Sequence, residues 1–201
     1  MYVLVFFTVL AFSLQMRNSL EQRRRVLLLG HFLRRYQIET LMQNLVDGYL
    51  RALGESDAQR RAAIWTVLDQ TETQLLGQVQ NLITDMGEAD PRQWQASTLA
   101  LGLPLATHWA PALTFDLRKL LRVHADGIAA AMTNSEDLSQ RDRAYRLCAE
   151  LLLLQHSCHW YCKSRWVASA RMLARHKTQY VQLLQAVSPA TRKSYASLTG
   201  V

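Results

Sequence analysis

IWTVLDQTETQLLGQVQNLITDM, residues 64–86, is the stretch that decides the fold class. Apolar side chains recur in it every three or four residues, as they do on one face of an α-helix. The repeat is sustained along the whole stretch and predicts a long helix lying in a coiled-coil-like groove. The residues of this stripe are Ile64, Leu68, Thr71, Leu75, Val79, Leu82 and Met86.

The composition of the rest of the chain agrees with an all-α fold. The 201 residues are 49% apolar, enough to bury a core, and they include only 8 Gly and 4 Pro. Leu, Ala, Gln and Arg dominate and are good helix formers, whereas β proteins need many turn residues. No alternating β pattern of useful length is present. The three cysteines, an odd number late in the chain, indicate free thiols in a reducing compartment.

Capping and breaking residues divide the chain into helices. Leu151–Leu154 is apolar on every side, so the helix that carries it is expected to be central and buried. The segment 134–143 is the most polar and is expected to be an exposed loop. The predicted helices cover residues 31–53, 56–86, 91–101, 115–132, 140–186 and a short segment after Ser188-Pro189. The sequence therefore predicts a helical bundle of about five to six helices.

A charge-free apolar segment precedes the predicted bundle. Residues 2–14 read YVLVFFTVLAFSL, and the run from Met1 to Met16 would form a helix ~24 Å long. A bilayer span takes ~20 residues, so this one is short. A cleaved signal peptide is disfavoured because no Lys or Arg precedes the run and no small-x-small site follows it. A buried core helix is the other alternative. We expect one N-terminal transmembrane helix.

Six arginines follow the apolar run and favour the membrane interpretation. Only Glu21 opposes them nearby, and Arg residues next to a span stay on the cytoplasmic side. They would contact anionic headgroups, which explains much of the net charge of +7. The predicted membrane-surface residues are Arg17, Arg23, Arg24, Arg25, Arg34 and Arg35.

These observations predict three parts. Residues 1–20 form the membrane anchor, residues 21–37 a basic juxtamembrane segment that continues the helix, and residues 38–201 a cytoplasmic all-α domain. The expected location is the inner (plasma) membrane, with a single pass and the C-terminal domain in the cytoplasm.

One cluster contains side chains of the types that bind metals or undergo redox reactions: His156, Cys158, His159 and Cys162. His and Cys are zinc ligands, but a single helix can direct only about two of these four side chains at one ion. We therefore expect no metal and no cofactor, and a metal- or redox-responsive domain remains an alternative. No nucleophile motif, phosphate-binding glycine loop or dinucleotide fingerprint occurs. We expect no catalytic residues, no small-molecule substrate and no enzymatic activity.

Two segments are candidates for partner binding. Residues 103–113 are apolar and irregular, and a second basic group lies in the C-terminal third. The predicted partner-binding residues are Leu103, Leu105, His108, Trp109, Leu113, Lys163, Arg171 and Arg175. A membrane-tethered nucleic-acid-binding protein is an alternative, but no recognised motif accompanies the charge.

The predicted function is that of a non-enzymatic, membrane-anchored helical protein acting through protein–protein contacts. Its expected partners are a lipid bilayer with anionic headgroups and another membrane protein. An accessory or regulatory component of a bacterial inner-membrane system, such as a secretion or conjugation accessory or an exclusion factor, would fit this description.

Overall fold

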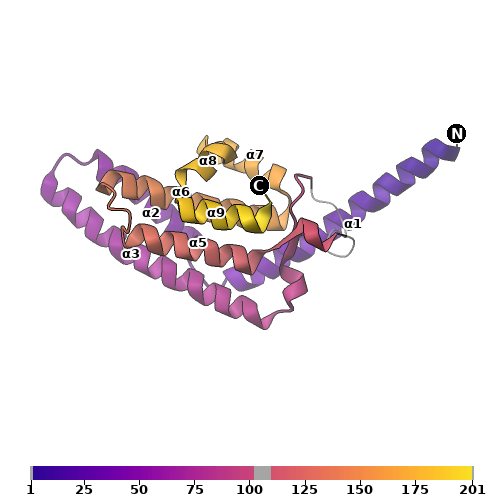
Figure 1. Cartoon of the computed structure of the whole chain (residues 1–201), viewed down its shortest axis with the longest axis horizontal. Helices are drawn as coiled ribbons and strands as arrows, with labels where there is room; N and C mark the ends of the chain where they lie inside the picture. The colour runs from indigo at the N-terminus through magenta and orange to yellow at the C-terminus, as the bar shows by residue number, and fades with distance from the viewer. Residues whose placement is uncertain (1, 102–109, 201) are drawn as a thin grey trace.

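The computed structural model describes residues 2–101 and 110–200, and its described residues form a helical bundle (Figure 1). The α-helices are α1 (Tyr2–Leu33), α2 (Ile38–Gly54), α3 (Ala58–Asp85), α5 (Leu117–Met132), α6 (Gln140–Cys162), α7 (Arg165–His176), α8 (Tyr180–Ala186) and α9 (Pro189–Thr199). The 3-10 turns are η1 (Met86–Glu88), η2 (Pro91–Trp94) and η3 (Pro111–Leu113). The prediction of an all-α bundle is confirmed, but the described residues form eight α-helices where about five to six were expected.

Helix α6 is the centre of the bundle. It packs against α1, α2, α5, α7 and α8. Leu151, Leu153 and Leu154 are buried, as the apolar run predicts. Neighbouring elements cover α6 on several sides, so its apolar side chains are removed from water on each of those sides, and this burial stabilises the fold.

Helix α3 carries the apolar stripe that the sequence predicts. Leu68, Leu75, Val79 and Leu82 are buried, and α3 packs on both α2 and α5. Its first turn is capped by Asp57, whose carboxylate accepts a hydrogen bond from the Arg60 N–H at 2.8 Å. A side chain that accepts from a free N–H in this way stabilises a helix start.

The predicted helix over 140–186 is wrong, because the chain breaks twice. Ser164 caps a new helix by accepting a hydrogen bond from the Val167 N–H, so α6 ends at Cys162 and α7 begins at Arg165. Lys177 then ends α7 in the left-handed region, at φ 54°. Both breaks let short helices fold back onto α6, where they bury apolar side chains such as Met172 and Leu183.

The predicted helix over 91–101 is also wrong. A 3-10 turn, η2, leads into strand β1 (Gln95–Ser97), which pairs antiparallel with β2 (Thr114–Asp116). Ala96 lies opposite Phe115 in this pair. Trp94 is completely buried and donates its indole N–H to the Met86 carbonyl at 3.0 Å. These tertiary contacts outweigh local helix propensity in so short a segment.

The predicted helix over 31–53 is interrupted at its beginning. Helix α1 ends at Leu33, a turn follows, and α2 starts at Ile38. Leu29 and Phe32 on the last turns of α1 are buried in the core, whereas the first half of α1 projects away from the bundle (Figure 1). The turn reverses the chain so that α2 can pack against α3.

The prediction of a transmembrane helix needs correction. Among residues 2–101 and 110–200, no helix combines the length and the apolar character that crossing a bilayer requires. Helix α1 has 32 residues, but its charge-free part ends at Met16. Fifteen residues of helix extend only ~22 Å, against a hydrocarbon core of ~30 Å.

Candidate functional site

The projecting half of α1 carries a concentration of exposed large apolar side chains. From Tyr2 to Met16 it has no charged residue. The large apolar side chains that are described there, those of Tyr2 and of residues 5–16, are exposed. Phe6 is 64% exposed and Phe12 is 70% exposed. A soluble surface rarely leaves so many large apolar groups together, so a surface of this kind marks a contact with lipid or protein.

The two hydroxyl groups in this segment are satisfied within the helix. Thr8 Oγ1 donates to the Val5 carbonyl at 2.8 Å, and Ser13 Oγ donates to the Val9 carbonyl at 2.8 Å. A hydroxyl bonded back to its own helix needs no water, so neither residue adds an unsatisfied polar group if the segment is buried in lipid.

The six predicted membrane-surface arginines do not share one environment. Arg17, Arg23 and Arg24 are exposed on the projecting part of α1. Arg34 and Arg35 lie about 25 Å further along the helix axis than Arg17. This separation exceeds the Debye length of ~8 Å at physiological salt, so the second pair and Arg17 act as separate charges.

Arg35 and Arg25 contact the bundle instead. Arg35, in the turn between α1 and α2, pairs at 3.2 Å with Asp85 at the end of α3. Arg25 is only 8% exposed, pairs with Glu21 and lies over the ring of Tyr161, 5.9 Å from its centroid. Arg25 therefore holds α1 against α6, and its long side chain is not free to reach lipid.

Lys163 takes part in the same junction. Its ammonium group donates to Gln22 Oε1 at 3.2 Å, which ties the end of α6 to the middle of α1. The other two basic residues of the predicted partner surface, Arg171 and Arg175, are exposed on α7 beside His159 and His176. Lys163 thus contacts α1, whereas Arg171 lies next to His159.

The apolar loop of the predicted partner surface is described only in part. Leu103, Leu105, His108 and Trp109 lie outside the described residues. Leu113 ends the 3-10 turn η3 and is 43% exposed. Its carbonyl accepts a hydrogen bond from the Thr98 N–H at 2.9 Å.

The His and Cys residues near the end of α6 point into different surroundings. His156 is buried and hydrogen-bonds Ser169 at 3.1 Å, whereas His159 faces Arg171, with 3.4 Å between Nδ1 and Nη1. Burial raises the pKa of Cys158 to about 12 and that of Cys162 to about 11, which keeps both thiols protonated. Across the described residues, no three His, Cys, Asp or Glu side chains are placed to hold a metal ion.

A serine–histidine pair in the core has the spacing of a nucleophile and its base. Ser157 Oγ lies 2.8 Å from His124 Nε2. Both residues are completely buried, and Ser157 Oγ also donates to the Leu153 carbonyl at 2.9 Å. A nucleophile must reach its substrate, so this pair is a structural hydrogen bond within the core.

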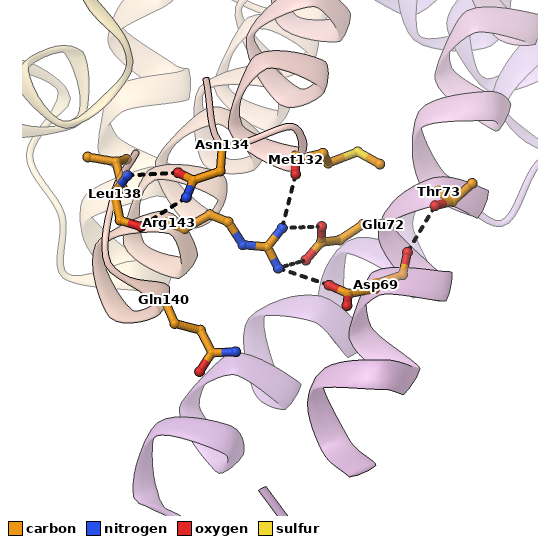
Figure 2. A pocket seen from close by; sticks show the side chains of 8 residues that line it. All are labelled: Asp69, Glu72, Thr73, Met132, Asn134, Leu138, Gln140 and Arg143. Carbon is orange, nitrogen blue, oxygen red and sulfur yellow. Dashed lines mark hydrogen bonds and ion pairs between the residues drawn. The ribbon is translucent and has the colours of Figure 1, made fainter. Parts of the chain in front are cut away.

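Figure 2 shows a pocket of about 420 Å³ between α3, the end of α5 and the start of α6, with Arg143 at its centre. The Arg143 guanidinium pairs with Glu72 at 3.0 Å and with Asp69 at 2.9 Å. Glu72, which is 2% exposed, also accepts a 2.6 Å hydrogen bond from the Tyr49 hydroxyl. Both Arg143 terminal nitrogens are thus engaged with protein oxygens, so the network joins three helices and leaves little capacity for a ligand.

Sequence reasoning missed this network. Glu72 lies one turn after Leu68 and one turn before Leu75, on the face that α3 buries. A single acidic residue inside an apolar stripe signals a buried partner, because an isolated buried carboxylate is costly. The sequence does not reveal that Arg143, 71 positions away, supplies it.

Comparisons of the chain with protein-family models, with curated proteins and with solved structures find no match. The candidate site therefore rests on the geometry of this chain. The exposed apolar segment Tyr2–Met16, followed by Arg17, Arg23 and Arg24, is the feature that the packing of the bundle leaves unexplained.

Proposed function

We propose that this protein is a non-enzymatic helical domain attached to a membrane by the first half of α1, where it acts through contacts with another membrane protein. The exposed apolar segment Tyr2–Met16 carries the proposal. Lipid is the environment that suits a helix apolar around its whole circumference, because an apolar partner on one side would leave the other sides in water.

The segment is short for a full crossing, so the proposal concerns burial in lipid and not a particular depth. About 22 Å of apolar helix can enter one leaflet and part of the next. Arg17 directly follows and can extend its charged end to the headgroups while its stem remains in the apolar layer. Exposed Arg23 and Arg24 lie about 10 Å further along α1, within reach of an anionic surface.

The arginines also suggest the side of the membrane. Basic residues next to a hydrophobic segment are retained in the cytoplasm. We accordingly place the bundle on the cytoplasmic face of the inner membrane. Each exposed arginine near anionic lipid contributes about 1 kcal/mol to attachment.

A small apolar surface on the bundle suits the second part of the proposal. Leu101 is 71% exposed, Leu113 43% and Trp166 64%. Two backbone hydrogen bonds connect the segments that carry these residues. The Thr98 N–H donates to the Leu113 carbonyl, and the Trp166 N–H donates to the carbonyl of Ala100, which precedes Leu101. Exposed Trp is enriched among residues that dominate protein interfaces.

Vesicle flotation of the full chain tests the membrane attachment with a matched pair of variants. Val9→Asp places a charge in the middle of the apolar segment, where it opposes lipid burial by about 2.5–3.5 kcal/mol. Val67→Asp makes the same change on α3 at nearly the same exposure, 61% compared with 60%. We expect Val9→Asp to reduce the vesicle-bound fraction more than tenfold and Val67→Asp to leave it unchanged.

The role of the arginines is tested in the same assay. The double variant Arg23→Gln/Arg24→Gln should lose affinity for vesicles with anionic lipid, by about 2 kcal/mol in low salt, and keep its affinity for neutral vesicles. Flotation of Val9→Asp at the wild-type level would refute attachment through α1. An equal loss in Val67→Asp would show that the acidic change acts on the fold.

A further inference from the structure

Two adjoining cavities form a groove beside α6 and α7, away from the network of Figure 2. Their volumes are about 440 Å³ and 370 Å³. Gln155, His159, Arg175 and His176 line both of them. Arg171 lines the first, and α2 forms the other wall of the second. Cavities of this size suit a small ligand.

The groove gathers positive charge without a matching acid. In the described part of the chain, neither Arg171 nor Arg175 has a carboxylate oxygen within the 4.0 Å of an ion pair. Arg171 instead approaches His159, with 3.4 Å between Nη1 and Nδ1, and His176 Nε2 lies 3.2 Å from Gln155 Oε1. Glu39 is the one acidic residue on the walls, and it lines the second cavity alone.

Helix ends account for part of this arrangement. Arg175 and His176 lie in the last turn of α7, and His159 lies in the last turn of α6, where cations interact favourably with the helix dipole. Arg171 lies a full turn before the end of α7, and its guanidinium faces an imidazole from another helix. The dipoles do not explain why all four groups converge on one cavity.

We propose that this groove binds the phosphate group of a small ligand. Arg171 and Arg175 can each present two parallel N–H donors to phosphate oxygens, a geometry that guanidinium groups provide and ammonium groups do not. His159 and His176 supply further ring donors, and Met172 and Ala174 give the same cavity an apolar wall for the adjoining part of the ligand. The ligand is bound and not converted, so no catalytic step is involved.

The histidines make binding dependent on pH. Burial and the neighbouring Arg171 lower the pKa of His159, and burial and Arg175 lower that of His176. The charged or titratable groups around His159 are Glu39, His156, Arg171, Arg175 and His176. A bound dianion favours the protonated imidazoles, so affinity should rise as the pH falls from 8 to 6. Sulfate tests this without ambiguity because its own charge is constant over that range.

The experiment uses the full chain in mild detergent at ~20 mM salt, where screening is weak. Calorimetric titrations with sodium sulfate, inorganic phosphate and glycerol phosphate are made on the wild type, Arg171→Gln and Arg175→Gln. Arg192→Gln, an exposed arginine on α9, is the control. We expect the wild type and the control to bind all three anions and each groove variant to lose about tenfold or more in affinity.

Vesicles distinguish a soluble ligand from a lipid headgroup. Vesicles with phosphatidate expose a phosphate monoester, whereas phosphatidylglycerol at matched charge exposes a diester, and attachment through α1 is common to both. A phosphatidate preference that Arg171→Gln abolishes identifies the headgroup as the source, and soluble binding without such a preference identifies a free phosphate compound. The proposal is overturned if sulfate and phosphate on the order of 10 mM do not bind and no phosphatidate preference exists. It is equally overturned if both groove variants bind as the wild type does.

Discussion

Mild acid should destabilise the bundle through two buried histidines, His124 and His156. Both side chains are completely buried. Burial lowers the pKa of each imidazole to about 3, with smaller contributions from nearby positive groups. In the unfolded chain a histidine has a pKa of ~6.5. Below pH 6.5 the imidazoles therefore bind protons in the unfolded state, whereas in the folded state they stay neutral until about pH 3. The free energy of unfolding decreases as the pH falls through this window.

The size of the effect follows from the linkage relation. Between pH 6 and pH 5, each buried histidine lowers the free energy of unfolding by about 1.2 kcal/mol. Between pH 7.5 and pH 5, the two together lower it by about 4 kcal/mol. A domain of this size has a stability on the order of 5–15 kcal/mol, so the loss is large enough to measure and leaves most of the protein folded.

Urea unfolding of the full chain in mild detergent, followed by tryptophan fluorescence at pH 6 and pH 5, measures this slope. His156→Phe keeps an aromatic ring against Tyr180, whose ring lies 4.5 Å from that of His156. We expect its slope to be smaller than the wild-type slope by about 1.2 kcal/mol per pH unit, and the same for His124→Phe. Tyr180→Phe, which keeps both imidazoles, is the control and should retain the wild-type slope.

Two buried carboxyl groups act in the opposite direction. Burial raises the pKa of Glu72 and of Glu150, so each contributes stability as the pH falls through its folded pKa. Both groups are present in the wild type and in all three variants, and their effect cancels when slopes are compared. Equal slopes in the wild type and both histidine variants would refute the reasoning, because they would show that the imidazoles are protonated alike in the folded and unfolded states.

Two further predictions concern the core. Gly127→Ala should lower the free energy of unfolding by about 2 kcal/mol, because the added Cβ would lie 2.6 Å from Glu150 Oε2. Gly77→Ala should raise the free energy of unfolding by about 0.5–1 kcal/mol, because no atom lies within 4 Å of its added Cβ. The urea midpoints of the two variants and the wild type measure both effects. Arg143→Met should lower the free energy of unfolding by about 3 kcal/mol, because it leaves the Glu72 carboxylate buried without its cation. Adding Glu72→Gln should recover part of that loss, and additive effects in the double-mutant cycle would contradict the coupling.

Local signals in the sequence predicted the helices that begin and end on strong caps. Ser139 caps α6 through the Asp142 N–H, and Ser188 with Pro189 starts α9. Gly200 ends α9 in the left-handed conformation, at φ 68°. These features depend on residues three or four positions apart, so a single sequence contains the information for them.

The elements that were predicted wrongly depend on distant contacts. Ser164 lies in a run without Gly or Pro, and the helix break there is supported by a hydrogen bond from the Trp166 N–H to the Ala100 carbonyl. The strand Gln95–Ser97 is defined by its pairing with Thr114–Asp116. Three-residue strands leave no periodicity to detect, so propensity alone favours helix in both places.

The candidate sites divide in the same way. The exposed segment Tyr2–Met16 was visible as an uninterrupted apolar run. The burial of Arg25 could not be predicted from the sequence, because it depends on contact with Tyr161 in another helix. The groove on α6 and α7 depends on the turn at Lys177 and the break at Ser164, which fold α7 back along α6.

The continuity of α1 has a consequence for the proposed membrane attachment, because it would fix how the bundle faces the membrane. No break separates Met16, the end of the apolar segment, from Gln22, which accepts a hydrogen bond from Lys163 of the bundle. Only about 9 Å of helix lies between them. Leu29 and Phe32 then fix α1 in the core. A flexible linker would let the bundle face the membrane in any orientation, whereas a short rigid helix makes that orientation a property of the fold. A partner in the same membrane would therefore meet one defined face of the bundle.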